Sequence, residues 1–130
     1  MDPKRLADVA IFSSLSKKDL ERLAQWTDEV SVPAGETLAE QGRFAHEFFV
    51  IEDGAAEVRQ NGERIAELGP GDFFGEIALL ETDRRTASVV ATTPMQVIVM
   101  FQREFKQMEK EMPSVATLIR SAIRARLENG

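Results

Sequence analysis

The sequence predicts a mainly β fold flanked by α-helices. Between residues 29 and 101, brief apolar or alternating runs are separated by turn residues, which is typical of an antiparallel sandwich or barrel. Apolar residues recur at helical spacing on both sides of this region. With 130 residues and 43% hydrophobic content, the chain supports one domain with a sizeable core. We therefore expect a single domain over 1–130, with N-terminal helices in 1–28, a β core in 29–101 and C-terminal helices in 102–130.

Two short helices are predicted before the β core. Asp2-Pro3 is a helix start signal, because an aspartate caps the first turn and proline suits the first helical position. Ser16, with Asp19 three residues further on, resembles a capping box before Leu20 and Leu23. Both helices are therefore expected to start at capped positions.

Seven strands are predicted in the central region from its runs and turns. Asn61-Gly62, between Val58 and Ile65, is a strong signal of a two-residue β-hairpin. Pairs and triplets rich in Gly, Pro, Asp and Asn delimit the other runs. The predicted strands lie near 29–32, 37–40, 47–52, 56–60, 63–68, 87–92 and 95–101.

The segment from residue 75 to residue 90 has the composition of an anion site. If Gly75 to Leu80 form a short helix, its first turn exposes backbone N–H groups and the positive end of the helix dipole to a phosphate. Gly75 lets the backbone approach closely. The apolar residues that follow would line the site and lower its local dielectric constant, which strengthens any charge interaction there.

The polar residues of this segment divide into different roles. Arg85 can offer a phosphate a planar, two-pronged set of donors, and the small Ala87 lets its backbone N–H approach. A carboxylate beside a phosphate would repel it, so we expect Glu76 to accept a hydrogen bond from a hydroxyl such as a ribose 2′-OH. Neighbouring strand residues point to opposite faces, so only one arginine of the pair enters the site and Arg84 is expected to be exposed.

Two C-terminal helices are predicted after residue 101. Phe101, Phe105, Met108 and Met112 follow one another at intervals of four, three and four. Pro113 suits the first turn of a second helix. The apolar stripe of that helix is expected at Val115, Leu118, Ile119, Ala122 and Ile123.

Composition disfavours several classes of function. The chain has no cysteine and one histidine, His46, so neither a thiolate site nor a cluster of imidazoles around a metal is available, and we expect no enzyme and no metal site. A net charge of −6 disfavours direct nucleic-acid binding. No apolar run is long enough to insert into a membrane and no secretory pattern is present, so a cytoplasmic location is expected.

Residues 71–90 resemble the phosphate-binding cassette of cyclic nucleotide-binding domains. The matching residues are Gly75-Glu76, the aliphatic run with Ala78-Leu79, and Arg85-Thr86-Ala87, introduced by Gly71-Asp72-Phe73-Phe74. The resemblance implies that Glu76 binds the ribose 2′-OH and Arg85 the cyclic phosphate. It further implies that backbone amides bind the remaining phosphate oxygens; these amides lie around Ile77, Ala78, Thr86 and Ala87.

The same resemblance implies an eight-stranded antiparallel β-roll, similar to a jelly roll, with the cassette helix at its mouth and C-terminal lid helices. The implied function is a cyclic-nucleotide sensor or regulatory domain that needs no cofactor besides its ligand. We expect cAMP in preference to cGMP, and movement of the C-terminal helices on binding. The implied partner is an effector, either a domain of a longer parent protein or a separate protein.

Other interpretations of the same residues remain. Glu76 could be an ordinary acid in a first helical turn, and Arg85 could pair with Glu81 or Asp83. The chain could also be a degenerate, ligand-free interaction domain that contacts a partner through its terminal helices. Intact Glu76 and Arg85 favour the sensor, because both would be costly beside an empty apolar pocket. The arginines near the C-terminus are expected to complement their helix dipole; these are Arg120, Arg124 and Arg126.

Overall fold

The computed structural model describes residues 2–75 and 84–129. Its helices are α1 (Pro3–Ala7), α2 (Lys17–Leu23), α4 (Gln102–Glu111) and α5 (Pro113–Asn129), with the 3₁₀ turns η1 (Ala10–Phe12) and η2 (Ala24–Trp26). Its strands are β1 (Asp28–Val32), β2 (Thr37–Ala39), β3 (Glu47–Asp53), β4 (Ala56–Gln60), β5 (Glu63–Leu68), β6 (Phe73–Phe74), β7 (Ser88–Ala91) and β8 (Met95–Phe101).

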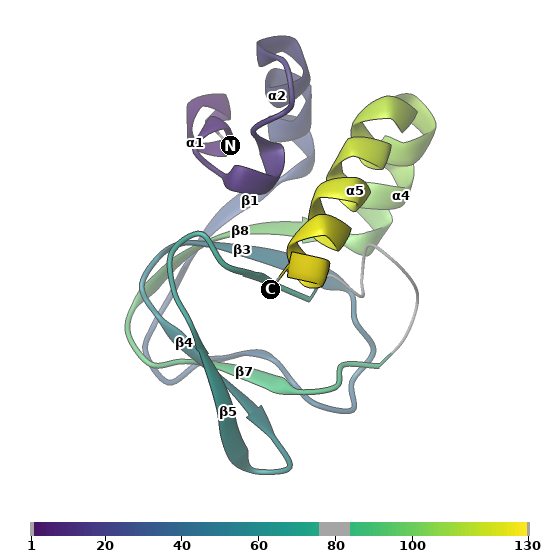
Figure 1. The fold of residues 1–130 in the computed structure, drawn as a ribbon. Coiled ribbons are helices and arrows are strands. Elements are labelled where there is room, and N and C mark those ends of the chain that lie inside the picture. The colour runs from purple at the N-terminus through teal and green to yellow at the C-terminus, as the bar shows by residue number, and fades with distance from the viewer. Residues whose placement is uncertain (1, 76–83, 130) are drawn as a thin grey trace.

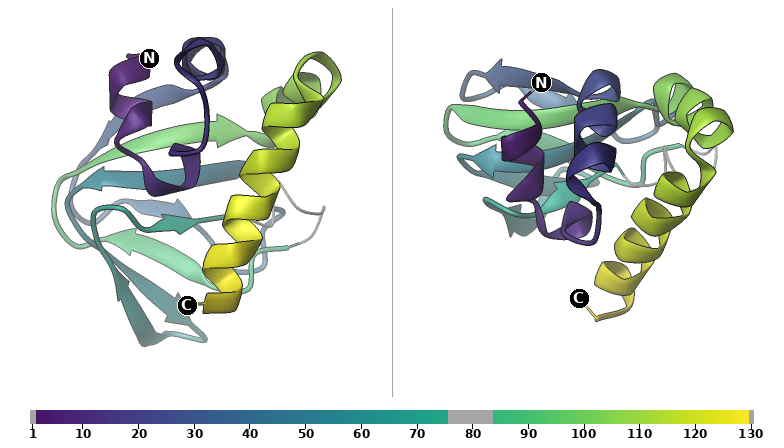
Figure 2. Two further views of the ribbon diagram at one scale, coloured as in Figure 1. Left: turned by 45° about the horizontal axis from the view of Figure 1, so that its top comes forward. Right: turned by 90° about the horizontal axis from the view of Figure 1, so that it is seen from above.

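The strands form two four-stranded antiparallel sheets. One has the order β1-β8-β3-β6 and the other the order β2-β7-β4-β5. α1, α2 and α4 gather over one face of the first sheet, and the second sheet lies on its other side (Figure 1). α5 runs back from the end of α4 alongside the roll (Figure 2). The predicted eight-stranded antiparallel β-roll with flanking helices is confirmed.

Strand β3 is buried on both faces, and this divides the core in two. Phe48 and Val50 point toward the helices, whereas Phe49 and Ile51 point into the roll, and each of the four side chains is at most 4% exposed. Such continuous burial explains why the run Phe48 to Ile51 is apolar without alternation.

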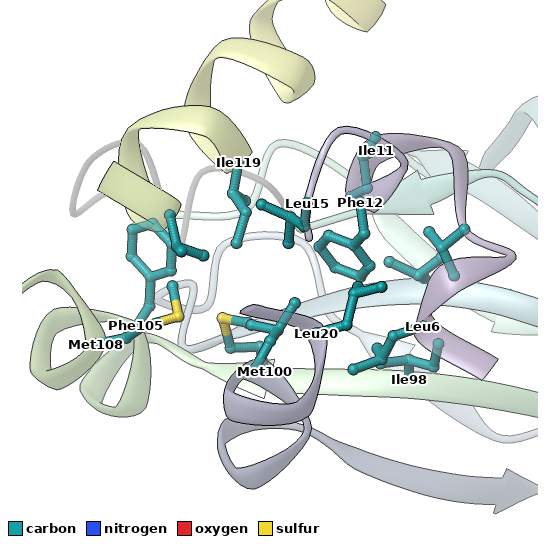
Figure 3. Packing of buried hydrophobic residues seen from close by; sticks show 14 of the residues in the cluster. Leu6, Ile11, Phe12, Leu15, Leu20, Ile98, Met100, Phe105, Met108 and Ile119 are labelled. Atoms are coloured by element: carbon teal, nitrogen blue, oxygen red, sulfur yellow. The ribbon is translucent and has the colours of Figure 1, made fainter. Parts of the chain in front are cut away.

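The larger core lies between the helices and the first sheet (Figure 3). It joins Phe12 and Leu20 of the N-terminal segment with Met100 of β8, and with Met108 and Ile119 of the C-terminal helices. The second core fills the interior of the roll with smaller side chains, mostly Val and Ala. The first sheet therefore packs against the helices on one face and against the interior of the roll on the other.

Both N-terminal helices start where the sequence predicts. The Asp2 carboxylate accepts from the Lys4 backbone N–H at 2.9 Å, and the Ser16 hydroxyl accepts from the Asp19 N–H at 3.1 Å. Each cap satisfies one of the N–H groups that a helix start leaves without an intrahelical partner. The two 3₁₀ turns were not predicted.

The predicted hairpin at Asn61-Gly62 is confirmed. Asn61 has φ 53° and Gly62 has φ 82°, the pair of positive values that a type I′ turn requires. The turn brings Gln60 opposite Glu63. Strand β6, by contrast, was missed. It consists of Phe73 and Phe74 alone, a run too short to show a period.

The C-terminal helices form as predicted, but the stripe of α5 is partly wrong. Leu118 is 41% exposed, whereas Ala116, which the stripe omitted, is fully buried with Ile119. Phe101 ends β8 and is 37% exposed, so it does not belong to the buried face of α4. Arg120 pairs with Glu109 of α4 and lies 5.1 Å above the Phe105 ring, so it joins the two helices and does not complement a helix end.

Candidate functional site

Arg85 is buried, with 9% of its surface exposed. Its backbone is held on both sides, because its N–H donates to the Arg43 carbonyl at 2.7 Å and its carbonyl accepts from the Gly42 N–H at 2.9 Å. The guanidinium Nη2 donates to the Glu47 carbonyl at 2.9 Å. The Arg85 Cζ also lies 6.0 Å from the centre of the ring of Phe49, which belongs to the core inside the roll.

Gly75 directly faces this arginine. Its φ of +78° is one that residues with a side chain rarely adopt. A Cβ atom at this position would lie 2.4 Å from the Glu47 carbonyl oxygen and 2.7 Å from Nη1 of Arg85. The sequence needs glycine here for the backbone conformation and for space, so Gly75, Glu47 and Arg85 form one close-packed unit.

The Arg84 side chain is exposed to solvent, on the side opposite to the buried Arg85, as predicted. Its Nη1 donates to the Gly42 carbonyl at 2.7 Å, and its guanidinium lies 4.4 Å above the ring of Phe44. Phe44 and Arg84 form an isolated antiparallel bridge, which aligns the two loop segments beside the site. The local strand geometry thus separates the two adjacent arginines into one buried and one exposed group.

Thr86 and Ala87 follow Arg85 in a bend before β7. Thr86 is exposed, and its carbonyl accepts from the Gln60 side chain at 3.2 Å; Ala87 is half-buried. The Ser88 hydroxyl accepts from the Gln41 backbone N–H at 2.9 Å. Ser88 therefore has a structural partner in the loop that also holds Arg85.

Three further predicted site residues, Glu76, Ile77 and Ala78, lie outside the described residues, as does most of the predicted cassette helix. Glu81 and Asp83, the alternative partners considered for Arg85, lie outside them too. The structure thus brings together Gly75, Arg85, Thr86 and Ala87 from the predicted set.

Sequence reasoning missed Glu47 and Arg43, which hold Arg85 through backbone carbonyls. A carbonyl group is the same in every residue, so no residue type could have marked these positions. Phe49 was also missed. Its signal was present as the buried strand itself, but a core phenylalanine and one that lines a site look alike in a sequence.

The rest of the described chain adds two observations. Within residues 2–75 and 84–129, no group of three or more His, Cys, Asp or Glu side chains could hold a metal ion. Among the helices of that same part of the chain, none has the length and apolar character that crossing a membrane requires.

The sequence model of the cyclic nucleotide-binding domain family matches residues 29–111 of the chain. These residues include both sheets apart from Asp28, the unit around Arg85, and α4. The chain belongs to the cyclic nucleotide-binding domain family, as the cassette residues predicted.

Several similar curated proteins are regulatory subunits of cAMP-dependent protein kinase. The subunit of Schizosaccharomyces pombe is 34% identical over 123 residues, which cover 94% of this chain and 29% of the relative. The subunit of Aspergillus fumigatus is 35% identical over 105 residues, which cover 79% of this chain and 25% of the relative. The chain thus spans less than a third of the length of either relative.

Solved structures share the fold over almost the whole chain. A cyclic nucleotide-binding domain from Methylobacillus flagellatus has a TM-score of 0.81 at 22% identity and covers 97% of this chain and 76% of its own. The structure of cAMP-bound PfPKA-R has a TM-score of 0.80 at 26% identity and covers 98% of this chain and 43% of its own. The chain is thus similar to a regulatory-subunit domain in sequence and in fold.

Proposed function

We propose that this regulatory domain binds cAMP, in preference to cGMP, at the end of the roll beside Arg85. The observation that carries the proposal is the burial of this arginine against Gly75 and the Glu47 carbonyl, in a chain whose net charge is −6. Burying a guanidinium is costly, and an anionic ligand would compensate for that cost. The cAMP-bound relative supports the choice of ligand.

Each predicted site residue has a proposed role. The Arg85 guanidinium, which the Glu47 carbonyl orients, binds the cyclic phosphate, and the amides around Ile77, Ala78, Thr86 and Ala87 bind its other oxygens. Gly75 keeps this space open, and Glu76 accepts from the ribose 2′-OH. No covalent step is involved.

We further propose that α5 covers the bound nucleotide. Ile119 and Ile123 are fully buried in the core and cannot reach a ligand without leaving it. Leu118, which is 41% exposed, and the half-buried Ala122 are apolar side chains of α5 that are available for this contact. The hinge is at Met112, because the proline that follows it disfavours helical geometry and Met112 has φ −138° and ψ 62°.

Titration calorimetry with cAMP and cGMP tests the site, using Arg85→Ala and its neighbour Arg84→Ala as a matched pair. Removing one partner of a buried charge interaction costs about 2–5 kcal/mol, so Arg85→Ala should weaken cAMP binding on the order of thirty-fold to several thousand-fold. Arg84→Ala should cost far less, because Arg84 is exposed. Equal losses would show that Arg85 is not the phosphate ligand.

The same titration tests the competing interpretation. If the folded wild-type chain binds neither nucleotide at millimolar concentration, it is a ligand-free interaction domain. A higher affinity for cGMP than for cAMP would correct the ligand and leave the role of Arg85 intact.

A further inference from the structure

The solvent-facing side of α4 carries a group of cations beside an exposed aromatic ring. Arg103, Lys106 and Lys110 are exposed, and with Phe101 and His46 they line a hollow of about 660 Å³. No ion pair among the described residues involves these three cations. We call the surface formed by these five residues the basic α4 surface.

The acids of α4 are turned away from this surface or are already engaged. Glu109 pairs with Arg120 of α5. Glu104 is half-buried, and burial, followed by repulsion from Asp28, raises its pKa. Glu111 lies on the flank of the helix, about 80° from Arg103 at 100° per residue. The positive charge of the surface is therefore not neutralised by its own helix.

Helix stability does not explain this arrangement. A cation is favourable in the last turn, where Lys110 lies, but unfavourable in the first turn, where Arg103 lies, because the N-terminal end of a helix is itself positive. Phe101 adds apolar area that is 37% exposed at the same place. A row of cations beside an exposed ring is complementary to a segment with carboxylates and at least one apolar side chain.

We propose that the basic α4 surface is a docking site for an acidic, partly apolar segment of a partner protein. Its cations bind carboxylates, and Phe101 packs on the apolar side chain of that segment. A nucleic acid fits less well, because its long row of phosphates would extend beyond the three cations over a chain with a net charge of −6, whereas a short acidic segment needs only the surface itself. The proposal does not depend on the binding of a cyclic nucleotide.

The basic α4 surface adjoins the candidate ligand site along the chain. The His46 carbonyl accepts from the Gln102 N–H at the start of α4, at 2.7 Å. The next carbonyl along the chain, that of Glu47, accepts from Arg85 at 2.9 Å. The docking surface thus begins one residue from the group that orients the arginine.

The test uses a fluorescein-labelled peptide that repeats Glu-Glu-Leu, with a Gln-Gln-Leu peptide as the neutral control, read by fluorescence anisotropy at low salt without nucleotide. Lys106→Gln/Lys110→Gln is compared with Lys17→Gln/Lys18→Gln, an equal change in charge at two exposed lysines of α2. The acidic peptide should bind the wild type and lose roughly three- to thirty-fold in affinity on the α4 variant, the range for two surface ion pairs. The α2 variant should bind as the wild type does.

Four results would overturn the proposal. They are no binding of the acidic peptide, equal binding of the neutral peptide, equal losses in the α2 and α4 variants, and tighter binding of a single-stranded oligonucleotide of the same charge. Sedimentation of the free protein adds a fifth outcome. A dimer that the α4 substitutions dissociate would assign the surface to a second copy of the chain.

Discussion

The stability of the fold should depend on the protonation of Glu52, a carboxyl group between α1 and the first sheet. Its side chain is 15% exposed, its Oε1 has no hydrogen-bond partner in the described part of the chain, and it lies beside Glu29 and 3.8 Å from Arg5. Burial, followed by the hydrogen bond with Glu29 and the charge of Glu29, raises the pKa of Glu52 from 4.5 to about 7. Arg5 pairs with Glu29. The pKa of Glu29 is lowered, chiefly by the hydrogen bond with Glu52 and further by the hydrogen bond with Arg5 and its charge.

The sign of the effect follows from where the proton is bound. Between about pH 4.5 and about pH 7 the folded chain keeps the Glu52 proton and the unfolded chain has lost it, so the free energy of unfolding falls as the pH rises. The full interval corresponds to about 3 kcal/mol, and solvent screening at this partly exposed pair reduces the expected loss to about 1–3 kcal/mol. Glu29 acts in the opposite direction, because its lowered pKa removes stability as the pH falls below its ordinary value of 4.5.

Glu52→Gln keeps a neutral hydrogen-bonding side chain at every pH and should remove this decline. We expect the variant to match the wild type near about pH 5 and to be about 1–3 kcal/mol more stable at about pH 8. Urea denaturation followed by the fluorescence of Trp26, the single tryptophan, measures the difference, since Trp26 packs against the larger core. Glu57→Gln, at a similarly buried carboxylate paired with Arg59, should retain the decline. Parallel pH profiles for the wild type and Glu52→Gln would refute the reasoning.

Two further predictions concern the candidate site and its cover. Gly75→Ala should lose about 1–3 kcal/mol of stability and weaken cAMP binding, because the new Cβ clashes with Glu47 and Arg85. Gly35→Ala, at φ +90° but in open space, should lose stability without a change in calorimetric affinity. Ile119→Ala should cost about 2–5 kcal/mol in urea denaturation. Leu118 is exposed, so Leu118→Ala should lower the free energy of unfolding by under about 1 kcal/mol and should instead weaken cAMP binding. Unchanged binding would exclude Leu118 from the cover of the ligand.

The elements that the sequence predicted well have local causes. The caps at Asp2 and Ser16, the turn at Asn61-Gly62 and the start of α5 at Pro113 each depend on the chemistry of one or two residues. β6 has no such cause, because Phe73 and Phe74 form a strand only through pairing with Val50 and Phe49. The misplaced Leu118 has a similar explanation. Helical periodicity defines a stripe, but the neighbouring core decides which edge of the stripe is buried.

The candidate site shows the same division between local and tertiary causes. The separation of Arg84 from Arg85 could be predicted, because it follows from the alternation of side chains along an extended segment. The need for glycine at position 75 was predicted as close backbone approach, but the groups that make it close come from β3 and the segment after residue 83. Contacts between residues so far apart in the sequence depend on how the sheets pack.

Strand β3 gives a physical basis for coupling between the ligand site and the helices. At its start, the Glu47 carbonyl orients Arg85 and the neighbouring His46 carbonyl holds the first turn of α4. One residue further, Phe48 points into the larger core with the α4 and α5 side chains, whereas Phe49 points toward Arg85. Because a close-packed interior resists small displacements, we expect a ligand that shifts Arg85 at the proposed site to disturb the packing of this strand as well. The proposed response of α4 and α5 to the ligand would travel by this path, because both helices pack on the opposite face of the strand.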